Sequence, residues 1–128
     1  MRQQFLSGLV LLAAIAGSVS TSAIANAQQV VRGLATWYGS EYSGSRTANG
    51  EMFNPAGLTA AHRSLPFGTQ VRVTNEKTGK SVVVRINDRL GDPKIMIDLS
   101  HGAAKAIRLT ETAPVKMEIL DKKGMSSK

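Results

Sequence analysis

The chain has 128 residues, of which 16 are basic and 9 acidic, giving a formal net charge of +7, and it contains no cysteine. The lack of cysteine excludes disulfides and a lipid-modified N-terminal cysteine, so a small domain must be held together by its own core. The basic residues are scattered, and no run of Lys and Arg is flanked by stacking aromatic side chains, which argues against nucleic-acid binding.

The first 27 residues have the pattern of a secretory signal peptide. Arg2 gives a positive start, residues 9–16 contain no polar side chain, and Ala25-Asn26-Ala27 matches the small-x-small pattern of a cleavage site. A membrane anchor is the alternative, but the apolar stretch is shorter than the roughly 20 residues that span a bilayer. We therefore expect cleavage after Ala27 and a soluble periplasmic or extracellular protein with no membrane-spanning segment.

The expected mature chain, residues 28–128, is long enough for one domain with a modest core. We divide it into a short linker (residues 28–31), a folded domain (residues 32–120) and a polar tail (residues 121–128). Without Arg2, 15 basic and 9 acidic residues remain, a net charge of +6. This charge could serve solubility alone, or it could attract an acidic polymer outside the cytoplasm, for which a cell-wall glycan carrying peptide carboxylates is the best match.

Short apolar segments between turn signals predict a mainly β domain. The expected strands cover residues 33–38, 58–61, 71–74, 81–87, 95–97 and 115–119. A long surface loop is expected over residues 39–50, with turns over residues 66–68 and 75–80. The unbroken valines 82–84 suggest a strand that is buried on both faces. Ser100 is a suitable N-cap for one short helix over residues 101–108.

Several short strands and one short helix suggest a small closed barrel, because closure removes exposed strand edges. Two β-rich halves, residues 33–75 and 81–120, suggest a duplicated barrel. Periodicity alone does not separate such a barrel from an open sheet or a sandwich.

Three side chains suited to acid–base chemistry, Glu51, His62 and Asp88, fall at the ends and turns of these strands. A compact β fold could bring them into one cleft. Asp88 is the leading candidate, because it follows a buried strand and partial burial would keep its carboxyl protonated enough to donate. Each residue also has a structural interpretation: Asp88 could cap a loop or pair with an arginine, Glu51 could be solvated, and His62 could be held by hydrogen bonds.

Seven segments closely resemble the rare lipoprotein A family. In chain order they read WYG (residues 37–39), TANGE (47–51), LTAAH (58–62), LPFGT (65–69), VRVTN (71–75), VRINDR (84–89) and IDLS (97–100). The resemblance covers about residues 32–120. It implies a six-stranded double-psi β-barrel and endolytic lytic transglycosylase activity on peptidoglycan. It further implies that Asp88 is the general acid and base, with Glu51 and His62 as supporting catalytic residues.

The remaining site residues are expected to bind the glycan. They are Tyr38, Asn49, Arg89 and Asp98. One of Trp37 and Tyr38 should face the core and the other the groove, because neighbours on a strand point to opposite faces. With no cysteine and two histidines, a metal site has little support, and we expect no cofactor.

One segment departs from the family pattern. Residues 90–93, Leu-Gly-Asp-Pro, follow Arg89, where the family usually has Gly-Pro, and this change bears on the shape of the cleft. A non-catalytic polysaccharide-binding module, as in expansin-like proteins with this barrel, is the alternative function, and an interaction protein similar to barwin is a third. In each case we expect a monomer, and for the favoured function its partner is the peptidoglycan glycan strand.

Overall fold

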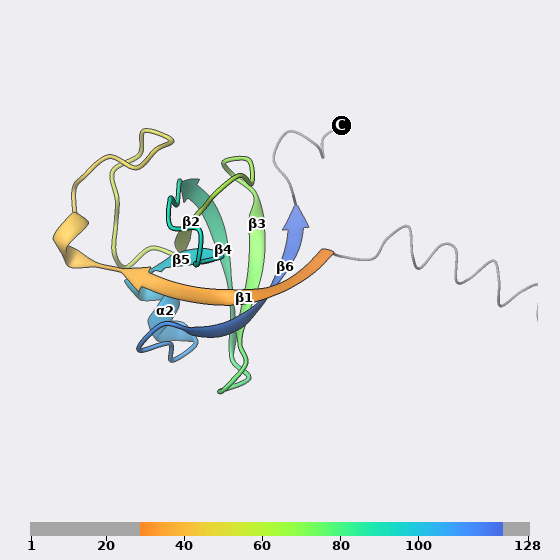
Figure 1. The fold of residues 1–128 in the computed structure, drawn as a ribbon. Helices are drawn as coiled ribbons and strands as arrows, with labels where there is room; N and C mark the ends of the chain where they lie inside the picture. Colours follow the sequence, from red (N-terminus) through yellow and green to blue (C-terminus); the bar gives the residue numbers. More distant parts are fainter. Residues whose placement is uncertain (1–28, 122–128) are drawn as a thin grey trace, which may run out of the picture.

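Six strands close into a barrel in the computed structural model, which describes residues 29–121 (Figure 1). The elements in chain order are β1 (Gln29–Tyr38), the 3-10 helix η1 (Ser40–Tyr42), β2 (Thr59–His62), β3 (Gln70–Asn75), β4 (Ser81–Asp88), β5 (Ile97–Ser100), α2 (His101–Ala106) and β6 (Ala113–Asp121). The strand order around the barrel is β1-β5-β2-β4-β3-β6, and β6 pairs with β1 to close it. The β1–β5 and β2–β4 pairs are parallel, whereas the other pairs are antiparallel.

The expected mainly β, six-stranded barrel with a short helix is therefore confirmed, although several boundaries differ. Residues 29–31, which we assigned to a linker, belong to β1, because β1 pairs with β6 from Gln29 opposite Ile119 to Ala35 opposite Ala113. The fifth strand lies later than expected, over Ile97–Ser100, and the helix ends earlier, at Ala106. The expected signal peptide and residues 122–128 of the expected tail lie outside the described residues.

The core fills the barrel and extends under α2. Its fully buried members include Val84 and Ile86 of β4, together with Val71, Val73, Ile97, Leu99, Ile107 and Val115. Val83, between the inward-facing residues of β4, is 38% exposed. The expectation that the valine run is buried on both faces is therefore wrong, because β4 has one face on the core and one face outward, as strands of a closed barrel do.

The long connection between β1 and β2, residues 39–58, extends to one side of the barrel (yellow in Figure 1). Its far end is held by α2, since the backbone N–H of Gly102 donates to the carbonyl of Pro55 (2.7 Å) and the Ser100 hydroxyl donates to the carbonyl of Gly57 (2.6 Å). Helix and connection approach so closely that a Cβ at Gly102 would lie 2.7 Å from the carbonyl oxygen of Ala56. Only glycine permits this contact, which fixes the connection beside the barrel.

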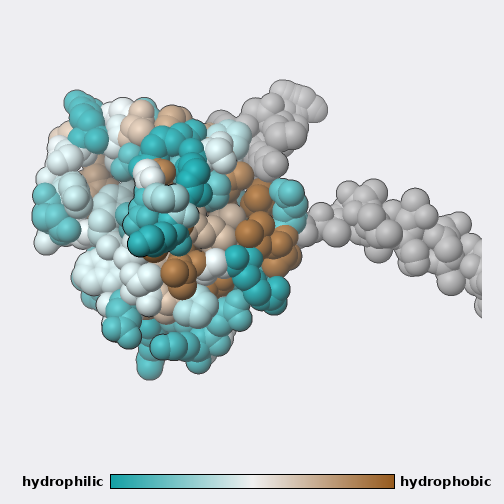
Figure 2. Space-filling model, in the orientation of Figure 1, coloured by the Kyte–Doolittle hydropathy of each residue, from teal (hydrophilic) through white to brown (hydrophobic). Residues whose placement is uncertain are grey.

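The molecular surface is mostly polar, with apolar patches close to where β1 begins (Figure 2). The exposed apolar side chains of that part of β1 are Val30, Val31 and Leu34. No helix within residues 29–121 has the length and apolar character needed to cross a membrane.

The inward direction of Ile86 gives a first test of this fold. We expect Ile86→Ala to lower the free energy of unfolding by about 2–5 kcal/mol, because it leaves a cavity in a closed core. Val83→Ala, on the outward face of the same strand, should cost less than about 1 kcal/mol. Urea denaturation of both variants measures the difference, and equal losses would contradict the orientation of β4.

Candidate active site

A cavity of about 250 Å³ lies between the long connection and the strands β1, β2, β4 and β5. It is lined by Tyr38, Tyr42, Ser45, Arg46, Thr47, Phe53, Ala61, Asp88, Arg89 and Asp98. Two aspartates thus meet in one concave site, each at or near the end of a strand. Four of the seven expected site residues, Tyr38, Asp88, Arg89 and Asp98, contribute to this lining.

The register around Ala61 brings the two aspartates together. On one side Ala61 pairs with Asp98 of β5, and on the other side it pairs with Asp88 of β4. The β2–β4 register shifts at this point, so that Ala60 pairs with Ile86 and Ala61 with Asp88, leaving Asn87 as an extra residue. Without the extra residue, the side chain of Asp88 would point to the same core-facing side as that of Ile86. The bulge turns Asp88 away from the core, and bulges often occur next to active sites because they redirect side chains in this way.

Hydrogen bonds orient the Asp88 carboxylate. Its Oδ1 accepts from the backbone N–H groups of Ala48 and Arg89, both at 2.9 Å, and its Oδ2 accepts from the Tyr38 hydroxyl at 3.4 Å. The Ala48 donor comes from the long connection, 40 residues away in sequence. Strand and connection together therefore define the direction in which this carboxylate faces the cavity.

Asp98 has a different environment. Its side chain is half-buried, and its Oδ1 is buried without a hydrogen-bond partner among the described residues. Burial, followed by the negative charges of Asp88 and Glu41, raises the pKa of Asp98 from 3.8 to about 6. A carboxyl group with this pKa is protonated in a minority of molecules at pH 7, far more often than an ordinary aspartate, and can donate that proton.

Aromatic rings form one wall of the cavity. Tyr38 stacks on Phe53 with ring centroids 4.6 Å apart and contacts the edge of Tyr42 at 5.8 Å. Burial and the two aspartates raise the pKa of Tyr38, so its hydroxyl keeps its proton and donates to Asp88. Trp37 does not line the cavity, and its ring stacks on His101 of α2. The expectation is thus confirmed for Tyr38, whereas Trp37 is 36% exposed and does not enter the core.

His62 and Arg89 lie next to each other at the cavity edge. The His62 Nδ1 accepts from the backbone N–H groups of Ser64 and Leu65, both at 3.1 Å, so the neutral ring carries its proton on Nε2. Burial, together with the charges of Arg63 and Arg89, lowers the pKa of His62. Its side chain lies outside the cavity lining, while its carbonyl accepts a hydrogen bond from the Arg89 guanidinium (3.2 Å).

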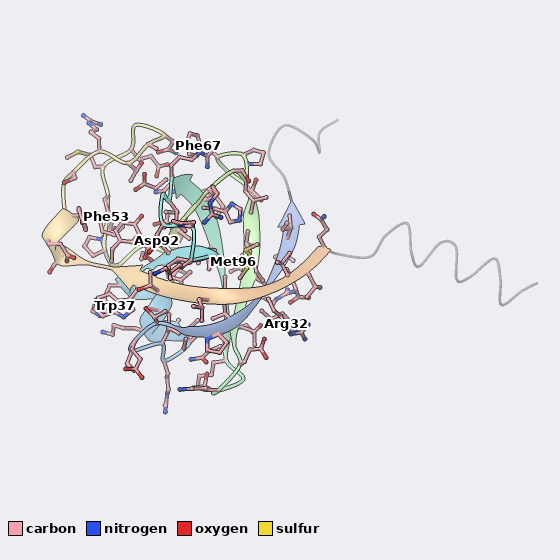
Figure 3. The ribbon with its side chains drawn as sticks, in the orientation of Figure 1. Arg32, Trp37, Phe53, Phe67, Asp92 and Met96 are labelled. Atoms are coloured by element: carbon pink, nitrogen blue, oxygen red, sulfur yellow. The ribbon has the colours of Figure 1, made fainter. Side chains whose placement is uncertain are left out.

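Arg89 lines the cavity, and contacts outside the cavity hold its guanidinium in place. Its Nη1 also donates to the carbonyl of Leu65 (2.9 Å), and its guanidinium lies 4.0 Å from the ring centroid of Phe67. The unusual residues 90–93 do not line this cavity. Instead they are tied back by Arg63, whose Nη2 donates to the carbonyl of Asp92 (2.8 Å; Asp92 is labelled in Figure 3).

Glu51 and Asn49 lie outside the aspartate cavity. The Glu51 carboxylate accepts two hydrogen bonds from Arg85 (2.6 and 3.2 Å) and one from Asn87 (2.9 Å). These bonds lower the pKa of Glu51 from 4.5 to about 2, so it is ionised near neutral pH and does not supply a proton. The Asn49 Oδ1 accepts from the Thr47 hydroxyl (2.6 Å) and from the backbone N–H of Glu51 (3.1 Å), which shapes the turn.

Several lining residues had no signal in the sequence. Phe53 and Ala61 are ordinary apolar residues whose role depends on register and on the path of the long connection. Among residues 29–121, no three His, Asp or Glu side chains are arranged to hold a metal ion.

Comparison with known proteins agrees with this fold. The family model described as lytic transglycolase matches residues 30–119. The chain belongs to this family. Its barrel is therefore the double-psi β-barrel that the sequence resemblance implied.

Curated family members share the barrel at high identity. The probable endolytic peptidoglycan transglycosylase RlpA of Synechocystis is 58% identical over 88 residues, covering 66% of this chain and 27% of the relative. The endolytic peptidoglycan transglycosylase RlpA of Pseudomonas aeruginosa (strain UCBPP-PA14) is 50% identical over 94 residues, covering 70% of this chain and 27% of the relative. The chain thus spans about a quarter of the length of these relatives.

Solved structures show the same fold at low identity. The apo expansin of Clavibacter michiganensis superposes with a TM-score of 0.59 and 18% identity, covering 77% of this chain and 53% of the expansin. A point mutant of that expansin, solved in complex with cellohexaose, gives a TM-score of 0.57 at 18% identity, covering 77% of this chain and 54% of the mutant. The likeness supports the barrel architecture.

The raised pKa of Asp98 predicts a pH dependence of stability. Because the folded carboxyl (pKa about 6) binds its proton more tightly than the unfolded one (3.8), its contribution is fully present below pH 3.8 and is lost as the pH rises through 6. The Asp98→Asn variant has no carboxyl group at this position, so it does not lose this stability as the pH rises. Its free energy of unfolding should therefore rise relative to the wild type between about pH 4 and 6 and stay level above that.

Urea denaturation of both proteins from pH 4 to 8 measures this difference. Glu51, with a pKa of about 2 in the folded state and 4.5 in the unfolded state, also changes stability near the acidic end of this range, but it is present in both proteins and cancels in their difference. Parallel curves for the two proteins across the window would show that Asp98 is not desolvated in the folded state.

Proposed function

We propose that this chain is a lytic transglycosylase domain that cleaves the MurNAc–GlcNAc glycosidic bond of peptidoglycan and leaves 1,6-anhydro-muramyl ends. The observation that carries the proposal is the pair of aspartates flanking Ala61 in one cavity, of which Asp98 has a pKa of about 6. The RlpA relatives, which are named as endolytic peptidoglycan transglycosylases, supply the substrate class.

The reaction needs one group that gives a proton and one that takes a proton. The bond between C1 of the muramyl sugar and its leaving oxygen breaks through an oxocarbenium-like transition state, and protonation of that oxygen assists departure. The C6 hydroxyl of the same sugar then attacks C1 and loses its proton. No water enters, so the product carries an anhydro ring in place of a new hydroxyl at C1.

The two aspartates match these tasks through their surroundings. Asp98, half-buried and next to a second carboxylate, gives its proton to the leaving oxygen. Asp88, held by two backbone N–H groups and by Tyr38, accepts the proton of the C6 hydroxyl. The proton returns from Asp88 to Asp98 through solvent before the next cleavage. The sequence interpretation assigned both steps to Asp88, whereas the geometry favours a division between two groups.

The other lining residues serve binding in this proposal. The Tyr38–Phe53 wall offers an aromatic surface on which a sugar ring can stack, and Arg89 offers a cation for the lactyl carboxylate or a peptide carboxylate. The reaction as written uses neither a metal nor a cofactor. We also propose that the chain is exported to the cell wall, which its signal-like first 27 residues and its positive charge support, and that it acts there as a monomer.

The direct test is mass spectrometry of the fragments released from isolated peptidoglycan. Wild-type protein should release fragments with anhydro-muramyl ends, and Asp88→Asn and Asp98→Asn should each lower the rate by about 100-fold or more, the usual contribution of a general acid or base. Asp88→Asn should still fold, because the asparagine oxygen can accept the hydrogen bonds of Ala48 and Arg89.

Asp92→Asn is the matched control, because Asp92 is exposed and lies outside the cavity, and it should keep the full rate. Fragments that are heavier than the anhydro products by one water molecule would contradict the proposal and show that the domain hydrolyses the bond instead. If the protein binds insoluble glycan but releases no fragments, the proposal is wrong and the domain is a non-catalytic binding module, as in expansin-like proteins.

A further inference from the structure

Residues 44–53 form a small hairpin within the long connection. The backbone N–H of Phe53 donates to the carbonyl of Ser45 (2.7 Å), and that of Thr47 donates to the carbonyl of Glu51 (2.7 Å). Arg46 pairs with Met52 between them. Gly50 closes the turn with φ of 95°, where its N–H donates to the Thr47 carbonyl (2.9 Å). The hairpin therefore has its own internal hydrogen bonds.

The base and the tip of this hairpin are attached to the barrel in different ways. At the base, Phe53 is buried and stacks on Tyr38 of β1. At the tip, the backbone N–H of Asn49 donates to the carbonyl of Asn87 (3.2 Å), and the Glu51 carboxylate receives Arg85 and Asn87 of β4. The two-pronged arginine–carboxylate contact fixes direction as well as distance, which a single contact does not.

The position of the tip decides whether Asp88 has its second backbone donor. Ala48 lies at the tip and is itself exposed, so no packing of its own side chain holds it in place. Its backbone N–H nevertheless reaches Oδ1 of Asp88 at 2.9 Å. Glu51 and Ala48 are three residues apart in one turn, and both contact the end of β4: Glu51 binds the side chains of Arg85 and Asn87, and Ala48 binds the side chain of Asp88.

We propose that Glu51 is a positioning residue: its ion pair with Arg85 clamps the tip of the 44–53 hairpin onto β4, so that the Ala48 amide holds the Asp88 carboxylate in its working direction. Glu51 then acts through Asp88 and not on the glycan. For its effect on turnover this inference rests on the proposed transglycosylase function, whereas its structural part stands independently.

Amide hydrogen exchange, followed by NMR on the purified protein, tests the structural part. Glu51→Gln and Arg85→Met should each speed exchange at Ala48 and Asn49 by about tenfold, because both amides bond across to β4 and local opening exposes them. The Thr47 amide, which bonds within the hairpin, should keep its protection. Unchanged exchange at Ala48 and Asn49 in both variants would overturn the clamp, and so would equal loss at all three amides, which would mean that the hairpin itself had melted.

Kinetics on peptidoglycan test the catalytic part. Both variants should lower kcat by about 10–100-fold, as losing a supporting contact to a reactive group commonly does, with little change in KM. The double variant should be no slower than either single variant, because both remove the same contact. If Glu51 instead reacts with the glycan directly, Glu51→Gln should abolish turnover while Arg85→Met, which leaves the carboxylate in place, retains it.

The Arg72–Glu118 ion pair between β3 and β6 provides the matched control. Its partners are 3.5 Å apart and, like Arg85 and Glu51, partly exposed, but neither of them lines the aspartate cavity. Glu118→Gln should change neither kcat nor exchange at Ala48. Absence of activity in the wild-type protein would defeat the proposed function, while the exchange measurement would still decide the clamp.

Discussion

The position of Ala61 between β4 and β5 is the constraint on which the site depends. Ala61 pairs with a strand on each side, and the register shift between Ala60 and Ala61 sets which β4 residue faces it. If the pairing continued without the shift, Asn87 would stand opposite Ala61, and Asp88 would stay on the side of Ile86. The extra residue, Asn87, is therefore what allows Asp88 and Asp98 to meet in one cavity. The alanine side chain is small enough to leave space between the two carboxyl groups.

Carboxyl groups have different surroundings at three positions of this fold. Asp98 meets burial and like charge, which favour its protonated form, whereas Glu51 meets an arginine and an amide, which favour its ionised form. Asp88 accepts its hydrogen bonds from backbone groups that come from two parts of the chain. Carboxyl chemistry in this protein is thus decided by neighbours that lie far away in the sequence.

Much of the fold could be predicted from local patterns, because alternation, turn residues and a helix cap act over a few residues. Ser100 illustrates this, since its hydroxyl accepts from the backbone N–H of Ala103 as an N-cap should. The bulge at Ala60–Ala61 and the ion pair of Glu51 could not be predicted in this way, because they depend on register between distant strands. Family resemblance pointed to Asp88, which lines one cavity together with Tyr38, Arg89 and Asp98, but it also grouped Glu51 and His62 with Asp88, and these two residues do not line it. Val83 could not be assigned from composition, because a run of valines does not indicate which of them faces the solvent.

Trp37 has a consequence for how this molecule can be observed. It is the only tryptophan in the sequence, it precedes Tyr38 of the cavity wall, and its ring stacks on His101. Its indole N–H also donates to the carbonyl of Thr110, so the ring has a defined orientation at the end of β1. The intrinsic tryptophan fluorescence of the whole chain therefore originates from one ring that packs on α2 at the end of β1, and changes in the packing of that end of the barrel can be followed optically without attaching a label.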